Sequence, residues 1–188
     1  FGFLRMGTSG MTSQAYGQQN KEETDRLLTR AVGVGLLVAF ALLLLQQPLL
    51  EVAFQFIQTT PEVERLARTY FHICIWGAPA TLGLYGFTGW FIGMQDSVSP
   101  MATDLTVNGM NVLMSFVLAL GVGSYEGMGF AGIAAGTVAA QYSGLVVAVA
   151  LMAGRYWKNT VSSLGLADLK EVFKGGETRR FFVMNADL

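Results

Sequence analysis

Four polar side chains recur along one apolar stretch of the sequence. Asp104, Asn108, Asn111 and Ser115 follow one another at steps of four, three and four residues, among Leu, Val, Met and Phe neighbours. In an α-helix this spacing puts all four on one face, over about 16 Å at about 1.5 Å per residue. Such a face could line a wet cavity where a cation or a substrate is handled. The alternative is that these groups only bond neighbouring helices together.

The composition indicates that this face lies inside a membrane. Hydrophobic residues make up 52% of the chain and charged residues 13%, against about 25% charged residues in typical soluble domains. Four long runs carry no charge at all: residues 31–50, 69–95, 105–125 and 127–154. A helix needs about 20 mostly apolar residues to cross a bilayer, and the runs lack the alternation of membrane β-strands. The sequence therefore predicts four complete spanning helices, and a soluble domain would have too little polar surface to cover them.

The basic residues predict which helix ends face the cytoplasm. If the helices alternate, segments 17–30, 94–101 and 154–180 lie on one side, and segments 58–70 and 121–129 lie on the other. Positive charge collects in cytoplasmic segments, so the first set is predicted to be cytoplasmic. The first set holds Lys21, Arg26, Arg30, Arg155, Lys158, Lys170, Lys174, Arg179 and Arg180, and the second only Arg65 and Arg68. The net charge of −1 gives no indication of a nucleic-acid partner.

Enzymatic and metal chemistry find little support in the sequence. Cys74 is the single cysteine and His72 the single histidine, so they provide neither a disulfide framework nor a metal cluster. An intramembrane enzyme would need a nucleophile with a base, or a pair of metal-binding histidines. His72 is interpreted as a packing residue, with titration for a purpose as the alternative.

Three stretches together resemble one known family. They are FLRMGTSGMTSQAYG near the start, YFHICIWGAPATLGLYGFTGWFIGMQDSVSP in the middle and AGIAAGTVAAQYSGL further on. In order and spacing they look like the first half of a multidrug and toxic compound extrusion (MATE) transporter of the DNA-damage-inducible bacterial branch. The resemblance implies an all-α integral membrane protein, with twelve helices in two six-helix lobes around a central cavity. It also implies export driven by H⁺ or Na⁺, with no other cofactor.

The resemblance also implies how the chain is divided. Residues 1–153 would supply the end of the second helix and all of helices three to six of the N-terminal lobe. Residues 154–180 would form the cytoplasmic linker between the lobes, and residues 181–188 would begin helix seven. The chain would then be an internal fragment, without helix one and its acidic coupling residue. The implied partners are membrane lipid, drug-like small molecules and the C-terminal lobe of the same full-length chain, in the bacterial inner (plasma) membrane.

The candidate site residues follow from the polar groups inside the spans. Asp104 could carry a proton or be an ordinary hydrated residue near the cytoplasmic boundary, whereas the asparagines could present a carbonyl to a cation or hold a carboxylate. Arg5, about 18 Å from the cytoplasmic end of its helix, needs a partner or water. The cavity or cation-coupling candidates are Arg5, Asp104, Asn108, Asn111, Ser115, Thr137 and Gln141.

Small, aromatic and proline residues complete the expectations. Gly132 and Gly136 have the spacing of closely packed membrane helices, and Pro79 should kink its helix. Family members often carry an acidic residue near Thr137 and Gln141, so this departure leaves cation binding there in doubt. Trp76, Tyr85 and Trp90 are expected to pack or to anchor at the interface, and substrate contact is their alternative role.

The functional prediction is a multidrug efflux transporter that exports organic, cationic or amphipathic compounds by antiport. The nearest alternative is a lipid-linked precursor flippase of the same superfamily, which would want more cationic cavity residues than Arg5. A non-transporting structural membrane subunit would explain the packing motifs but not the polar face from Asp104 to Ser115.

Overall fold

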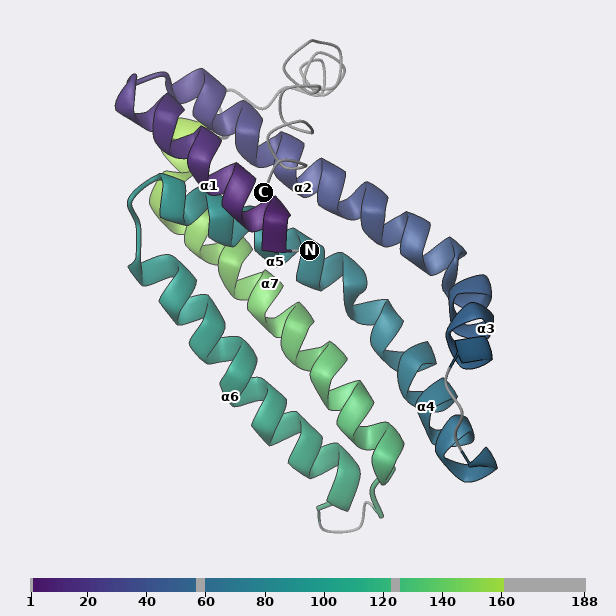
Figure 1. Ribbon diagram of the computed structural model, residues 1–188. Helices are drawn as coiled ribbons and strands as arrows, with labels where there is room; N and C mark the ends of the chain where they lie inside the picture. Colours follow the sequence, from purple (N-terminus) through teal and green to yellow (C-terminus); the bar gives the residue numbers. More distant parts are fainter. Residues whose placement is uncertain (1, 57–59, 123–125, 161–188) are drawn as a thin grey trace.

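The fold consists of helices that run back and forth along one direction (Figure 1). The computed structural model describes residues 2–56, 60–122 and 126–160, with side chains up to residue 156. Within these ranges every regular element is helical, which confirms the all-α prediction. The elements are α1 (Gly2–Gly17), α2 (Lys21–Leu44), α3 (Gln46–Phe56), α4 (Pro61–Cys74), the 3₁₀ turn η1 (Ile75–Gly77), α5 (Ala78–Gly93), α6 (Val98–Leu120) and α7 (Phe130–Thr160).

Three of the described helices are long and apolar enough to cross a membrane: α2, α6 and α7. The fourth predicted span, residues 69–95, is divided among α4, η1 and α5. These three elements follow one another along a single bent helix axis (Figure 1). Residues 1–16, predicted as the end of a further helix, form α1 except for residue 1, which lies outside the described residues.

The helices extend well beyond the charge-free runs. Segment 17–30, predicted as a loop, is mostly the start of α2, where the Asn20 side chain accepts a hydrogen bond from the backbone N–H of Glu23 at 3.1 Å. This cap and the acidic first turn stabilise a helix that begins among charged residues. Segment 58–70 is likewise helical from Pro61, and α7 continues past residue 154 to Thr160. The rest of the predicted linker and the start of helix seven lie outside the described residues.

All four prolines fall in the first turn of a helix. Pro61 begins α4, Pro79 is the second residue of α5, and Pro48 and Pro100 are the third residues of α3 and α6. Proline is tolerated there because a first-turn N–H has no intrahelical partner. Pro48 therefore explains why α2 stops at Leu44, although the sequence predicted one unbroken helix over 31–50.

The kink predicted at Pro79 is confirmed as the 3₁₀ turn. Pro79 has no N–H to donate to the carbonyl of Ile75, and the N–H of Ala78 donates to it instead. The next carbonyl, that of Trp76, accepts a hydrogen bond of 2.9 Å from the hydroxyl of Tyr142 on α7. The turn thus keeps its backbone groups bonded, as a helix break at membrane depth requires.

The core lies where α1, α2 and α5 pack together. Trp90 and Phe91 on α5 are fully buried, and Leu27 and Leu28 of α2 are buried with them or beside α1. The approach of α1 to α5 is close, because a Cβ added to Gly89 would lie 2.6 Å from the backbone oxygen of Arg5. Large buried side chains and the close backbone approach at Gly89 therefore hold these three helices together.

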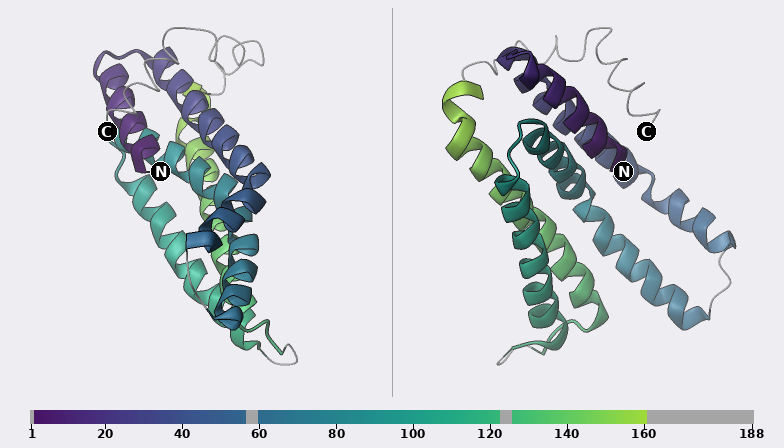
Figure 2. Two further views of the ribbon diagram at one scale, coloured as in Figure 1. Left: turned by 45° about the vertical axis from the view of Figure 1, so that its right-hand side comes forward. Right: turned by 60° about the vertical axis from the view of Figure 1, so that its left-hand side comes forward.

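The remaining pair, α6 and α7, is packed differently. α6 lies along α7 and contacts little else, and the pair runs to a connecting loop that is well separated from the α3–α4 tip (Figure 2, right). A Cβ on Gly136 would lie 2.5 Å from the backbone nitrogen of Ser115, and one on Gly132 would collide with the backbone at Leu118. This contact confirms the prediction that the G-x-x-x-G spacing serves close helix packing.

Candidate functional site

The polar stripe predicted on α6 divides into two halves. The half made of Asn111 and Ser115 bonds to α7. The Asn111 amide donates to Thr137 Oγ1 at 3.1 Å, and the Ser115 hydroxyl donates to the carbonyl of Ile133 at 3.5 Å. The other half, Asp104 and Asn108, makes no hydrogen bond to another helix within the described part of the chain. Asn108 donates to the backbone oxygen of Asp104 on its own helix at 2.8 Å, and both side chains are exposed.

The stripe lies on one edge of the α6–α7 contact. The face of α6 that meets α7 carries small and apolar residues such as Val107, which packs against Gly144. The face away from α7 is apolar and exposed, with Leu105, Val112 and Phe116 along it. The stripe runs between these two faces, so it can meet another protein element or water while the apolar face meets lipid.

A third helix packs against α7. The Tyr70 ring on α4 packs against that of Phe130 on α7 with centroids 5.5 Å apart. The polar cluster itself is the pair Asn111 and Thr137, which links α6 and α7. The sequence analysis missed Tyr70 because an isolated tyrosine on a long apolar helix carries no periodic signal.

The other predicted polar candidates lie apart from this cluster or beside it. Gln141 is half-buried one turn from Thr137, without a side-chain hydrogen bond inside the described ranges. Arg5 is exposed on α1, which packs against α5 and α2 rather than against α6. The acidic partner expected for Arg5 is not found among the described residues, and Arg5 is not brought to Asn111.

The three aromatic candidates have different environments. Trp90 is fully buried, and its indole N–H donates to the backbone oxygen of Thr24 at 2.9 Å. It therefore belongs to the core, and its burial argues against substrate contact. Tyr85 is half-buried against the α1–α2 cluster, whereas Trp76 is 58% exposed within the 3₁₀ turn. Of the three, Trp76 is the side chain that a ligand could reach most easily.

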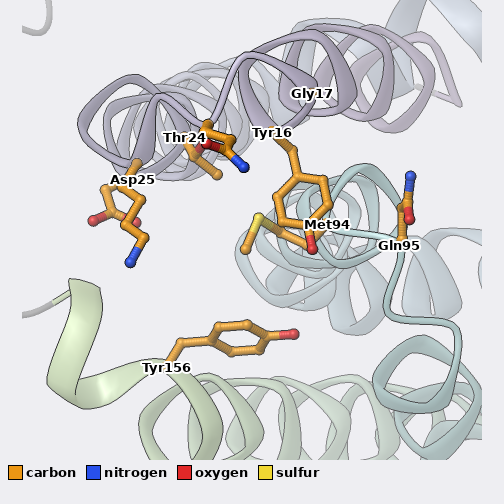
Figure 3. A pocket seen from close by; sticks show the side chains of 9 residues that line it. Tyr16, Gly17, Thr24, Asp25, Met94, Gln95 and Tyr156 are labelled. Carbon is orange, nitrogen blue, oxygen red and sulfur yellow. The ribbon is translucent and has the colours of Figure 1, made fainter.

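An open cavity of about 760 Å³ lies at the opposite end of the bundle from the α6–α7 loop. The α1–α2 and α5–α6 connections border it, and the rings of Tyr16 and Tyr156 and the Met94 thioether lie around it (Figure 3). These connections belong to segments predicted to be cytoplasmic, and they gather at one end of the fold as the alternating topology requires.

Next to this cavity lies an ion pair that the sequence analysis did not predict. Asp96, in the α5–α6 connection, accepts hydrogen bonds from the Arg155 guanidinium at 3.1 and 3.2 Å and from the Tyr156 hydroxyl at 3.1 Å. Burial alone would raise the pKa of Asp96. The hydrogen bonds from Ser99, Tyr156 and Arg155 outweigh that effect and lower its pKa to about 2.

Comparison with known proteins gives one consistent result. The MatE family model matches residues 1–117. The DNA damage-inducible protein F of Escherichia coli (strain K12) is 30% identical over 190 residues, covering 99% of this chain and 39% of that protein. A solved structure, described as an inward-facing conformation of a multidrug resistance MATE family transporter of the MOP superfamily, matches with a TM-score of 0.74. It is 18% identical, and the match covers 92% of this chain and 40% of that one. The chain thus spans about 40% of the length of these relatives.

Proposed function

Because this chain belongs to the MatE family of integral membrane proteins, we propose that it forms part of one lobe of a secondary multidrug exporter. The exported compounds are organic and cationic or amphipathic, and antiport against H⁺ or Na⁺ drives their export. The lobe works in the bacterial inner membrane with a C-terminal lobe supplied by the remainder of a longer protein. The names of the two relatives and the resemblance of the sequence motifs support this proposal.

The observation that carries the proposal is the exposed half of the α6 stripe, Asp104 and Asn108. Asp104 and Asn108 are exposed on a helix that is long and apolar enough to span a membrane. A carboxylate or an amide facing lipid costs several kcal/mol, so such groups face a protein interior or a water-filled path. A central cavity between two lobes provides that environment, and a purely structural subunit does not need it.

In this proposal the two halves of the stripe have different roles. Asp104 and Asn108 meet the water, cation or substrate directly, because their side chains are exposed and make no hydrogen bond to another of the described helices. Asn111 and Thr137 hold the neighbouring part of the stripe in place, and Asn111 keeps an amide oxygen available for a cation or for a carboxylate from another helix. Gln141 on α7, one turn from Thr137, contributes further polar surface to the same interior.

Transport by the full-length protein tests the proposal. Cells that lack their own drug exporters would carry the full-length protein, and efflux of a fluorescent cationic dye would be followed with the H⁺ or the Na⁺ gradient collapsed in turn. We expect efflux that stops when one of the two gradients is removed. The matched control is Glu22→Gln, which removes a surface carboxylate paired only with Arg26 on its own helix. Wild-type protein that reaches the membrane in full amount yet exports no cationic or amphipathic dye would contradict the proposal.

A further inference from the structure

The Asp96 carboxylate joins the start of α6 to α7 at the predicted cytoplasmic end. It lies directly before α6, and its Oδ1 accepts the backbone N–H groups of Val98 and Ser99 at 3.0 and 3.1 Å. Its Oδ2 accepts the Ser99 hydroxyl at 2.6 Å. Since Ser97 at the N-cap position makes no side-chain cap bond, Asp96 satisfies the first turn of α6 in its place.

The same carboxylate is held from the other side by α7. Arg155 donates to both of its oxygens and also to the Ser99 hydroxyl at 3.2 Å, while Tyr156 donates to Oδ2. The Tyr156 ring packs against Trp90 of the core with centroids 5.0 Å apart. The Asp96 side chain is only 9% exposed, whereas that of Arg155 is 47% exposed, so the carboxylate is shielded from solvent and the guanidinium is open on one side. We call Asp96, Ser99, Arg155 and Tyr156 the cytoplasmic clamp.

The cytoplasmic clamp supplies some of the few polar contacts between α6 and α7 among the described residues. Along the rest of their length the two helices meet through glycines and small apolar groups, with the Asn111–Thr137 bond in the middle. Such contacts allow sliding or rotation more readily than a charge-assisted hydrogen-bonded pair, here made by one guanidinium nitrogen of Arg155 with both Asp96 oxygens. α6 has buried residues only in its first two turns, at Ser99, Pro100 and Thr103, beside the cytoplasmic clamp.

We propose that the cytoplasmic clamp is the positioning device that fixes the rotation of α6 on α7, so that the two helices move as one unit during transport. Asp96 is thereby a positioning residue, which holds the α6 stripe towards the transport path without touching the transported compound. This inference rests on the proposed function for its role in transport, whereas the fixing of α6 on α7 can be measured independently.

The first part of the test measures the helix pair itself. In full-length protein with Cys74→Ala, spin labels at Leu105 on α6 and Val146 on α7 sit on surfaces that are 72% and 68% exposed. We expect a narrow distance distribution that broadens or shifts in Asp96→Asn and in Arg155→Gln. The double variant should resemble either single variant, because all three lose the same ion pair. Glu22→Gln, which breaks an exposed pair within α2, should leave the distribution unchanged.

The second part measures transport by the same variants. We expect Asp96→Asn and Arg155→Gln each to lower efflux about tenfold at equal membrane level, as the loss of a charged hydrogen-bonded partner implies. Arg155→Lys keeps the positive charge and should retain part of the efflux that Arg155→Gln loses. The pH at half-maximal efflux should stay unchanged, because a positioning residue does not carry the proton. If Asp96→Asn does not accumulate in the membrane, Tyr156→Phe, which loses one hydrogen bond, provides the test with a smaller shift in distance.

Two results would overturn the inference. One is an unchanged distance distribution in Asp96→Asn, in Arg155→Gln and in Tyr156→Phe. The other is a displaced pH profile in Asp96→Asn, which would make Asp96 part of proton coupling. A wild-type protein that exports nothing would instead contradict the proposed function, and the distance measurement would still decide whether the cytoplasmic clamp holds α6.

Discussion

The α1–α2–α5 core and the α6–α7 pair are built from the same kinds of residue but packed by different means. The core buries large side chains such as Trp90 and Phe91. The indole N–H of Trp90 donates a hydrogen bond to the backbone oxygen of Thr24 on α2. The pair instead brings two backbones together at glycines, and beyond its first two turns α6 buries no side chain.

This difference distinguishes a region whose role is packing from one that can carry exposed polar groups. A helix with one packed face can keep polar groups on its edge, whereas a helix surrounded by other helices must satisfy or exclude them. α6 carries Asp104 and Asn108 exposed, while α5 buries its aromatic residues and carries no charge. The chemistry of transport is therefore expected on α6, and the stability of the lobe on α5.

The largest loss of stability is expected when a core side chain is removed. Trp90→Ala removes a fully buried indole and its hydrogen bond, which should cost about 3–5 kcal/mol of unfolding free energy. Thermal unfolding of the purified full-length protein measures this loss, together with the protein level in the membrane. Trp76→Ala is the matched control, since Trp76 is largely exposed and its removal should change the melting temperature little. Equal melting temperatures for the two variants would contradict the assignment of Trp90 to the core.

The pair itself should be sensitive to one methyl group. Gly136→Ala places a Cβ against the backbone of Ser115, which cannot move aside as a side chain can. The α6–α7 contact should lose about 1–3 kcal/mol, the usual cost of overpacking. The control is Gly109→Ala on α6, where a Cβ meets nothing within 4 Å. Thermal stability that falls in both variants, or in neither, would show that close backbone approach is not what holds the pair.

Acid should weaken the end of the α6–α7 pair that Asp96 holds before it weakens the core. The pKa of Asp96 is about 2, below its ordinary value near 4, so its stabilising contribution is complete above about pH 4. It is lost as the pH falls from about 4 to 2, at a cost of about 1–2 kcal/mol after solvent screening. Melting temperatures measured between pH 6 and pH 3 should drop more steeply in wild type than in Asp96→Asn. Parallel curves would mean that Asp96 is not held by its partners.

The 3₁₀ turn connects the two regions and should show a smaller effect. Tyr142→Phe removes the hydroxyl that bonds the Trp76 carbonyl, while the turn keeps its own bond from Ala78 to Ile75. We expect a loss of about 0.6 kcal/mol, the average for such bonds between membrane helices. Amide exchange near Trp76 provides the measurement, and unchanged exchange would mean that α7 does not support the turn.

Much of the fold was predictable because membrane burial leaves a simple signal. Long runs without charge identified the spanning helices. The spacing of Gly132 and Gly136 predicted the close contact that α7 makes with α6. The helix boundaries were less predictable, because charged residues such as Glu22 and Glu23 at an interface favour a helix start as much as they end an apolar run. The break at Leu45 was missed because Pro48 was not considered as a first-turn proline.

The site was predicted only in part, and the reason is physical. The polar stripe on α6 is periodic within one helix, so the sequence contains it. Tyr70, Tyr142 and the Asp96–Arg155 pair act across helices, and each is a single polar residue whose partner lies far along the chain. Only the packing of the helices brings such residues together.

The central claim is that the α6 stripe serves transport more than folding, and Asn111 tests it most directly. Asn111→Leu removes one bond to Thr137, which should cost only about 0.6 kcal/mol of stability. Export by the full-length protein, normalised to its amount in the membrane, would be measured at several pH values beside Ser115→Ala, which changes the same face. We predict normal membrane levels for both variants, with export and its pH dependence lost in Asn111→Leu and largely kept in Ser115→Ala. Wild-type export across the pH range in Asn111→Leu would contradict the claim and leave the stripe as a packing feature.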